Sequence, residues 1–442
     1  MKKFFSMLLL ICISLSFFSA CAKNPDILTE EDGGLDFNGE KFIILTEWYT
    51  KDLHPNRGGS ASDDRMLDRF IDTAKNFNLV FDYPMVESIP VYMLGRSLSG
   101  NCHIDMTEIK DASLYDAYRQ GMLLPAADVV NDADSDKWKS PANNAVALFG
   151  GKMYGIFPNY WEYAPGVMGM INVNLDRLAE YDLEDPHEIV EAGEWNWENF
   201  REFLKKITFN DGEREWCGMG MGINGVGVAC IFPFVLSNGG HFVTERDGRY
   251  YSGIDSPEAM EAYEYIADLG ANGLITEVHT DEPEYFNGLK WMATSGGPSS
   301  SDDFNMAQFR YPYGPHGNKD TVSTITYGFN MWAFPIFSAY TEDEVGTVAE
   351  YLFEPLDASV YPNGWKDIIE DTLFCYTSEY EYYIKAAEQA EFIDINILYD
   401  SFWQLSNAML DLSKGNISPA HAVDGITDFI NEEINQKYNR QK

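Results

Sequence analysis

The sequence predicts an α/β protein made of two lobes. The chain has 442 residues, whereas one domain usually holds roughly 100–200 residues. Short β-branched or aromatic runs also alternate along the chain with amphipathic helical segments. This alternation is typical of largely parallel sheets covered by helices on both faces, in which ligands bind beyond the carboxyl ends of the strands. We therefore expect two such lobes, with a ligand site at strand ends.

Four runs have the composition of strands, and four helices have recognisable starts. The strand runs are residues 41–46 (KFIILT), 79–83 (LVFDY), 167–173 (VMGMINV) and 327–334 (YGFNMWAF). The helix starts are Ser62, Asn196, Ser256 with Pro257, and Ser418 with Pro419. Each capping side chain can accept a hydrogen bond from an N–H of the first helical turn. A proline at the first helical position sacrifices no hydrogen bond, because an N–H there has no partner within the helix. We also expect Trp195 and Phe200 to pack across the start that Asn196 caps.

The N-terminus has the pattern of an export signal. Lys2 and Lys3 precede the apolar run 4–18, and Phe18-Ser19-Ala20-Cys21 follows. This tetrapeptide resembles a bacterial lipobox, which implies cleavage before Cys21 and lipidation of its thiol. An ordinary signal peptide or an uncleaved helix is the alternative. We assign residues 1–21 to a lipoprotein signal peptide and 22–37 to a polar tether, and expect an extracytoplasmic protein, lipid-anchored to the outer face of the cell membrane.

The charge balance excludes one class of partner. The chain has 70 acidic and 31 basic side chains, a net charge of −39. Nucleic-acid binding requires a basic surface that displaces phosphate counterions, so no nucleic-acid partner is expected. Acidity of this kind is commonly a solubility feature and identifies no ligand.

Cysteine and histidine spacing predicts neither a metal site nor a cofactor. The cysteines after Cys21 are far apart, and both disulfides and free thiols are open alternatives for them: Cys102, Cys217, Cys230 and Cys375. The seven histidines have no zinc-ligand spacing. Residues 220–225 match GxGxxG, the pattern of a dinucleotide-binding turn. They lie mid-chain in a glycine-rich stretch of an exported protein, so we expect no dinucleotide site there. Asp132, Asp134 and Asp136 have the spacing of the first ligands in a calcium-binding loop. The glycine and the closing glutamate of such a loop are missing, so we expect no calcium site there.

Ten short segments follow one another along the mature chain. They are 104–105 (ID), 118–125 (YRQGMLLP), 151–158 (GKMYGIFP), 170–175 (MINVNL), 185–197 (DPHEIVEAGEWNW), 238–240 (NGG), 255–259 (DSPEA), 286–292 (FNGLKWM), 311–315 (YPYGP) and 414–419 (KGNISP). In this order they resemble the extracellular solute-binding proteins of carbohydrate ABC importers, the maltose-binding-like family. Ile171 and Asn196 depart from the family pattern, which has tyrosine and threonine there.

The resemblance implies a two-lobed, periplasmic-binding-protein-like fold of type II with a ligand cleft between the lobes. It implies chain crossings near 155–160, 287 and 325. The N-terminal lobe would then hold 38–155 plus 288–325, and the C-terminal lobe 156–287 plus 326–442. Such lobes close on a ligand by hinge motion.

The implied function is capture of a sugar or oligosaccharide outside the cell and its delivery to the permease subunits of an ABC transporter. We expect a monomer that is not an enzyme. Two alternatives stay open: a receptor for a peptide or another polar solute on the same fold, and a surface glycosidase that uses two carboxylates as acid and base.

A sugar offers flat C–H faces and a rim of hydroxyl groups, so its site needs aromatic platforms and carboxylates or amides. Glu47, Trp48 and Tyr49 follow the first predicted strand directly, where a half-buried loop is the alternative. Glu108 and Asp111 come just after the strand that carries Asp105, again at an end expected to face the cleft, and solvated loop carboxylates are their commoner role.

Further candidates lie near the implied crossings. Tyr160, Trp161 and Glu162 lie on the first crossing, where both lobes can reach them. Ser295 and Ser299 belong to a glycine- and serine-rich run whose backbone can approach a ligand closely, or which is only a turn. The remaining aromatic candidates are Trp332, beside the last crossing, and Phe232 and Trp365, for which core packing is the alternative.

Overall fold

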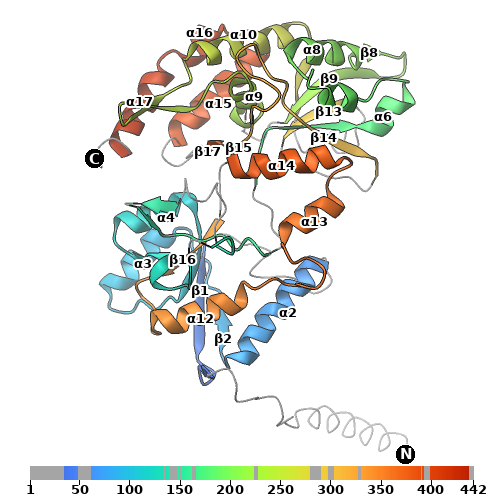
Figure 1. The fold of residues 1–442 in the computed structure, drawn as a ribbon. Coiled ribbons are helices and arrows are strands. Elements are labelled where there is room, and N and C mark those ends of the chain that lie inside the picture. The colour runs from blue at the N-terminus through green and yellow to red at the C-terminus, as the bar shows by residue number, and fades with distance from the viewer. Residues whose placement is uncertain are drawn as a thin grey trace, which may run out of the picture.

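The chain folds into two lobes, each built on its own sheet (Figure 1). The computed structural model describes residues 34–47, 61–133, 135–138, 147–149, 151–161, 166–222, 227–278, 290–296, 303–326, 330–389, 391–392 and 399–437. The two lobes have separate hydrophobic cores, and a small third cluster packs around Trp365 and Tyr383. The predicted two-lobed α/β fold is confirmed.

The first lobe contains a mixed five-stranded sheet in the order β2-β1-β3-β16-β4. Its strands are β1 (Lys41–Thr46), β2 (Val80–Asp82), β3 (Met106–Lys110), β4 (Leu123–Leu124) and β16 (Asn330–Pro335). Strands β1, β2 and β3 are parallel, and β16 runs antiparallel to β3 and β4. The other elements of this lobe are α2 (Ala61–Asn76), α3 (Ile89–Leu98), α4 (Asp111–Arg119), η1 (Ala126–Asp128), β5 (Leu148–Phe149), β6 (Lys152–Met153) and α12 (Glu342–Leu352).

The second lobe contains a sheet in the order β12-β9-β13-β7-β14, with β8 paired to β9. Its strands are β7 (Met170–Asn174), β8 (Phe209–Asn210), β9 (Glu215–Gly222), β12 (Ile275–Val278), β13 (Trp291–Gly296) and β14 (Met306–Arg310). Strands β12, β9 and β13 are parallel, whereas β7 runs antiparallel to β13 and β14.

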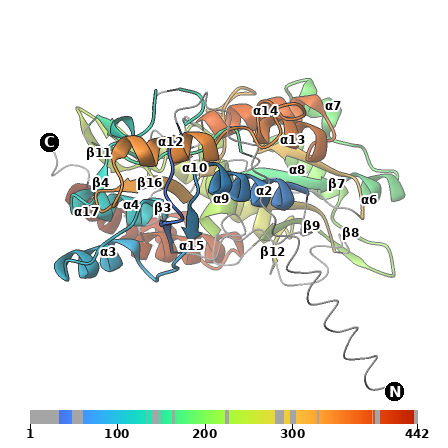
Figure 2. The same ribbon diagram turned by 90° about the horizontal axis from the view of Figure 1, so that it is seen from below.

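Helices surround the second sheet, and two small ladders accompany it (Figure 2). The helices are α6 (Leu175–Glu180), α7 (His187–Glu191), α8 (Trp197–Lys206), α9 (Gly227–Ser237), α10 (Pro257–Ala271), α13 (Trp365–Thr372), α14 (Thr377–Gln389), α15 (Tyr399–Ser413), α16 (Pro419–Val423) and α17 (Ile426–Lys437). The ladders pair β10 (Val243–Arg246) with β11 (Arg249–Ser252), and β15 (Ile325–Thr326) with β17 (Glu391–Phe392). Figure 1 shows α13 between the two lobes.

Three of the four predicted helix starts are confirmed. The Oδ1 atom of Asn196 accepts from the Asn199 N–H at 3.0 Å, and Ser256 and Ser418 cap α10 and α16 in the same way. The Trp195 and Phe200 rings meet edge to face with their centroids 5.2 Å apart, which confirms the predicted packing across the start of α8. The cap at Ser62 is wrong, because α2 already begins at Ala61.

The predicted lobe boundaries need correction after residue 287. The stretch 288–325 was expected in the first lobe, but β13 and β14 lie in the second sheet. Conversely, residues 330–353 belong to the first lobe, because β16 pairs with β3 and α12 packs in the first core. The chain therefore crosses between the lobes after 157, between 326 and 330, and between 353 and 365. Strand composition does not say which sheet a run joins, since that depends on pairing with strands far away in sequence.

No helix among the described residues is long and apolar enough to cross a bilayer. The predicted signal peptide with Cys21 and most of the tether lie outside the described residues. Of the two alternatives for the later cysteines, the structure shows free thiols at Cys102, Cys217, Cys230 and Cys375.

Candidate functional site

The first two crossings are paired with each other at their described ends. At their first-lobe end, the Ile156 N–H donates to the Trp332 carbonyl at 2.7 Å, and the Trp332 N–H donates back at 2.9 Å. At their second-lobe end, Met168 and Ile325 exchange two hydrogen bonds of 2.8 Å. The antiparallel segments are thus paired where they leave each lobe.

The third crossing is hydrogen-bonded to the first. The Trp365 N–H donates to the Trp161 carbonyl at 2.8 Å. The residue before it, Gly364, has a φ of 60° and a ψ of −125°. Residues other than glycine rarely adopt this backbone conformation. A Cβ atom at Gly364 would also lie 2.4 Å from the carbonyl carbon of Tyr160. Glycine is therefore needed for the two backbones to approach this closely.

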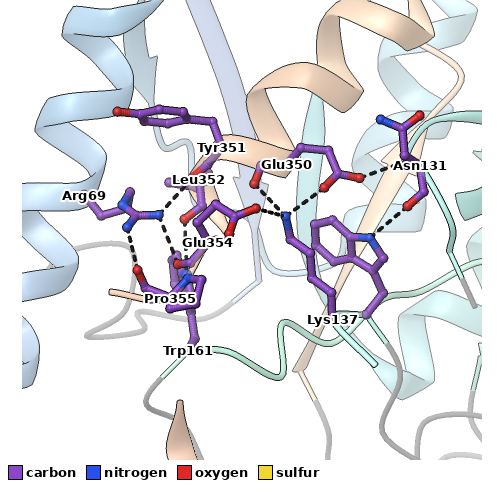
Figure 3. Close-up of polar contacts among 10 residues, drawn as sticks. Arg69, Asn131, Lys137, Trp161, Glu350, Tyr351, Leu352, Glu354 and Pro355 are labelled. Carbon is purple, nitrogen blue, oxygen red and sulfur yellow. Dashed lines mark hydrogen bonds and ion pairs between the residues drawn. The ribbon is translucent and has the colours of Figure 1, made fainter. Parts of the chain in front are cut away.

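Side chains of the first lobe hold the start of the third crossing (Figure 3). The Arg69 guanidinium donates to the carbonyl oxygens of Tyr351, Glu354 and Pro355 at 2.9, 3.0 and 2.7 Å. The Trp161 indole N–H donates to the Leu352 carbonyl at 3.1 Å. These oxygens lie at the end of α12 and just beyond it, where helix carbonyls lack partners within the helix. The third crossing is therefore anchored to the first lobe as far as Pro355.

A lysine adds to the same anchor (Figure 3). The Lys137 ammonium donates to the Glu350 carbonyl at 2.8 Å, to the Glu350 carboxylate at 2.7 Å and to the Glu354 carboxylate at 2.6 Å. Its side chain is only 11% exposed, so this ion pair is better shielded from solvent than a surface pair. Sequence reasoning missed both Arg69 and Lys137, because nothing local to either marks a partner more than 200 residues away.

The carboxyl ends of the parallel strands in both lobes lie at the edges where the crossings enter. Strand β16 begins directly after the chain arrives from the second lobe, and its first residue, Asn330, pairs with Lys110 at the carboxyl end of β3. In the second lobe β7 begins after the first crossing, and Met170 pairs with Gly296 at the carboxyl end of β13. Because ligands of open α/β sheets bind beyond carboxyl ends, these two edges form the candidate site.

Carboxylates mark the first-lobe edge. The Glu47 Oε1 atom, one residue beyond β1, accepts from the Ile89 N–H at 2.7 Å and from the Ser113 hydroxyl at 2.5 Å. Its other oxygen is buried and has no hydrogen-bond partner in the described part of the chain. Glu108 pairs in register with Thr46 and Trp332 and is 5% exposed. Ser113 was missed, although it follows a strand end as Glu47 does.

Small polar side chains mark the second-lobe edge. Ser295 precedes the last residue of β13 and is 1% exposed. Its hydroxyl has no hydrogen-bond partner among the residues described. A buried hydroxyl without a partner costs free energy unless a ligand or water satisfies it. The second edge thus offers a buried hydroxyl, whereas the first edge offers carboxylates.

Four predicted aromatic platforms are buried in the structure. Trp161, Phe232, Trp332 and Trp365 are 2%, 1%, 5% and 3% exposed. The Trp161 ring lies 4.9 Å from Phe353 and 6.2 Å from Trp332 between centroids, inside the first core. A stacking platform needs an accessible ring face. This placement corrects the expectation that these four rings present one.

The other predicted residues are divided between described and undescribed parts. Tyr160 is half-buried at the first crossing and is the one described aromatic candidate with substantial exposure. Asp111 begins α4, but its side chain is not described. The remaining candidates lie outside the described residues: Trp48, Tyr49, Glu162 and Ser299.

Two cavities lie within single lobes. One of about 260 Å³ lies between α7, β14 and α14, and one of about 160 Å³ lies beside Asp105 and Tyr340. Drug-sized ligands occupy pockets of roughly 300–1,000 Å³. Neither cavity has the volume for an oligosaccharide. No group of three metal-ligating side chains occurs in the described part of the chain.

Comparison with known proteins supports this organisation. No family model matches the chain. The GacH receptor of Streptomyces glaucescens, solved unliganded and with acarbose, aligns with a TM-score of 0.60 and 15% identity over 90% of this chain and 99% of that one. A cyclo/maltodextrin-binding protein complexed with maltotetraose aligns with a TM-score of 0.60 and 15% identity over 90% and 98%.

A third solved structure gives the same result. The cyclic α-maltosyl-1,6-maltose binding protein of Arthrobacter globiformis aligns with a TM-score of 0.63 and 14% identity over 90% of this chain and 99% of that one. At such identities the similarity shows the fold. The chain has the fold of the maltose-binding-like solute-binding proteins, type II among periplasmic-binding folds. All three similar structures are binding proteins rather than enzymes.

Proposed function

We propose that this protein is a lipid-anchored substrate-binding protein that captures a sugar or oligosaccharide between its lobes and delivers it to the permease of an ABC transporter. The observation that carries the proposal is the placement of the two carboxyl edges. Both edges border the crossings, and each carries a buried polar group without a hydrogen-bond partner among the described residues, the Glu47 Oε2 atom and the Ser295 hydroxyl. A solute held between the edges would contact both lobes at once.

A carbohydrate fits these groups best. Carboxylate oxygens accept hydrogen bonds from sugar hydroxyls, and a serine hydroxyl can donate or accept. Tyr160 adds an aromatic face at the crossing between them. The similar proteins were solved with acarbose or maltotetraose, or are named for a cyclic maltosyl sugar. Within the proposed site we place Glu47, Glu108, Tyr160 and Ser295, while Trp48, Tyr49, Asp111, Glu162 and Ser299 stay predictions.

Anchoring and delivery rest on the sequence. The lipobox around Cys21 would hold the protein at the outer face of the membrane, and residues 22–37 would let the lobes stand off it. Hinge closure of the two lobes would give a permease a closed form to recognise.

Calorimetry on residues 22–442 against a panel of mono- and oligosaccharides tests the proposal. We expect at least one sugar to bind with a micromolar or lower Kd. Tyr160→Ala should weaken binding by about 1–2 kcal/mol, roughly 5- to 30-fold, because it removes an aromatic face. The matched control is Tyr251→Ala, another half-buried tyrosine, which lies on β11 in a separate two-stranded sheet.

Three results would count against the proposal. Folded protein that binds no sugar across the panel would remove the carbohydrate, and competition by a peptide or another polar solute would replace it. Equal sugar affinities of the Tyr160 and Tyr251 variants would show that the ligand does not bind beside the crossings. Release of a cleaved product from the bound sugar would indicate a glycosidase instead.

A further inference from the structure

The outer face of α3 is apolar. Val91, Leu94 and Leu98 are 70%, 43% and 81% exposed. They are spaced i, i+3 and i+7, so they form one stripe along the helix. Gly95 lies within this stripe, and a Cβ atom added to it would have no neighbour within 4 Å. The stripe is therefore a row of apolar side chains with a notch in its middle.

This stripe is not needed to attach α3 to the lobe. The inner face of the helix is formed by Ile89, Pro90 and Met93, which are all buried. A surface helix normally turns a polar face to solvent once its inner face is covered. Figures 1 and 2 both place α3 at the outer margin of the first lobe. The helix thus has a second apolar face with nothing packed on it among the described elements.

Charge distinguishes the stripe from the rest of the surface. The chain has 70 acidic residues, yet residues 88–104 contain none. The one full charge in this segment is Arg96, whose guanidinium lies 5.7 Å from the centre of the Tyr92 ring. An occupant of the stripe would meet leucine and valine side chains flanked by a cation. This surface complements an apolar segment that carries an acidic or carbonyl acceptor.

The helix also begins at the candidate site. Its first N–H, that of Ile89, donates to the Glu47 Oε1 atom at 2.7 Å. Glu47 lies at the carboxyl end of β1, on the edge between the lobes. A partner seated on α3 would therefore lie beside the point where a ligand leaves.

We propose that the stripe of Val91, Leu94, Gly95 and Leu98 docks an apolar helical segment of the membrane-embedded partner that receives the ligand. The proposal rests on the function proposed above. Apolar residues three and four apart, with a glycine between them, allow the ridge of one helix to enter the groove of another. The stripe spans seven residues, about 10 Å, which matches the width of one helix.

The same observations disfavour the other occupants. A flat anionic bilayer would also meet the acidic residues next to the segment, such as Glu87 and Asp116, which are exposed. A second copy of this chain would bring together two proteins that each have a net charge of −39, and these would repel each other. The stripe of that copy would also contain no acidic side chain to pair with Arg96.

The experiment compares two double variants in ATPase assays. The docking variant is Val91→Glu with Leu98→Glu. The control is Leu148→Glu with Val360→Glu, which places the same charges on two other exposed apolar residues, 49% and 56% exposed. Each is titrated, with sugar present, onto an ABC importer whose ATPase activity the wild-type protein stimulates, held in phosphatidylcholine nanodiscs. We expect the docking variant to need at least 10-fold more protein for half-maximal ATPase stimulation, and the control to stay within 2-fold of wild type.

Equal half-maximal concentrations for wild type and docking variant would overturn the proposal, as would an equal loss in the control. Binding of wild type to phosphatidylglycerol vesicles that the docking variant abolishes would assign the stripe to lipid. A dimer in sedimentation that the same variant dissolves would assign it to a second copy. Calorimetry must give unchanged sugar affinity for both variants. Failure of the proposed function is distinguishable, because it appears in the wild-type chain as absent sugar binding.

Discussion

Each lobe buries one carboxylate that holds a strand N–H, and the two carboxylates differ in their neighbours. In the first lobe Asp105 accepts from the Ile43 N–H at 2.6 Å, the Ser338 hydroxyl at 2.7 Å and the His103 Nε2 at 3.1 Å. In the second lobe the donors to Glu379 are all backbone groups, as far as the described residues show. They are the N–H groups of Gln308, Cys375 and Tyr376, at 2.6, 3.0 and 3.2 Å.

Burial has the largest effect on the pKa of both carboxyl groups, and these neighbours modify it. Burial raises the pKa of Asp105, while its hydrogen bonds and the nearby His103 oppose the rise. Burial raises the pKa of Glu379 to about 7, and the charge of Asp185 adds to the rise. Both pKa values are raised chiefly by burial, but a basic neighbour opposes the rise at Asp105 and an acidic neighbour adds to it at Glu379.

The largest expected effect concerns the first lobe. Trp161→Ala should lower the free energy of unfolding by about 3–5 kcal/mol, because it removes a buried indole and its hydrogen bond to the Leu352 carbonyl. Calorimetric scans of the variant should show the loss in the transition of the first lobe. Weakened sugar binding with an unchanged melting temperature would instead support the sequence-based expectation of a ligand platform.

The next effect concerns the second lobe and pH. The pKa of Glu379 is higher in the folded state, about 7 against an ordinary 4.5, so the folded state binds the proton more tightly. Its contribution is fully present below pH 4.5 and is lost as pH rises through 7, a change of about 3 kcal/mol. Urea unfolding between pH 4.5 and 8 should show this decline in the wild type but not in Glu379→Gln.

Two controls sharpen the comparison of the carboxylates. Glu388→Gln changes an exposed carboxylate on the same helix, α14, and should keep the wild-type pH profile. Asp105→Asn removes the counterpart in the first lobe and should leave the second-lobe decline intact. A wild-type unfolding free energy that rises between pH 4.5 and 7 would contradict the assignment to Glu379.

A smaller effect is expected at the anchor of the third crossing. Arg69→Lys should lower the free energy of unfolding by about 1–2 kcal/mol, because an ammonium group cannot reproduce the fork that reaches three carbonyls. Chemical denaturation measures it, with Arg119→Lys, at the exposed end of α4, as the control. Equal stability of the two variants would mean that water replaces the lost contacts.

Prediction from sequence succeeded where the signal was local. Asn196 caps α8 because its side chain reaches an N–H three residues away, and KFIILT forms β1 because its residues favour a buried strand. The position of Glu47 directly after a strand also followed from the order of residues, whereas Ser295 was expected in a glycine- and serine-rich run and the structure places it in β13. Contact of either with a ligand stays a prediction.

Prediction failed where distant partners decided the outcome. Residues 291–296 and 330–335 are both strands of similar composition, yet they join different sheets. Trp161 lies on a crossing, as expected, but Phe353 and Trp332 cover its ring. The anchor at the end of α12 joins Arg69 to carbonyls 282 to 286 residues away, and no periodicity could have revealed it.

By itself the sequence determined the starts of α8, α10 and α16, the strands β1, β2, β7 and β16 and the α/β class with two lobes, because capping, periodicity and composition act within a few residues. Only the tertiary structure decided which strands share a sheet, where the chain crosses between lobes and which aromatic rings are covered. Those outcomes depend on pairing and packing between residues hundreds of positions apart, whose free energies no local pattern contains.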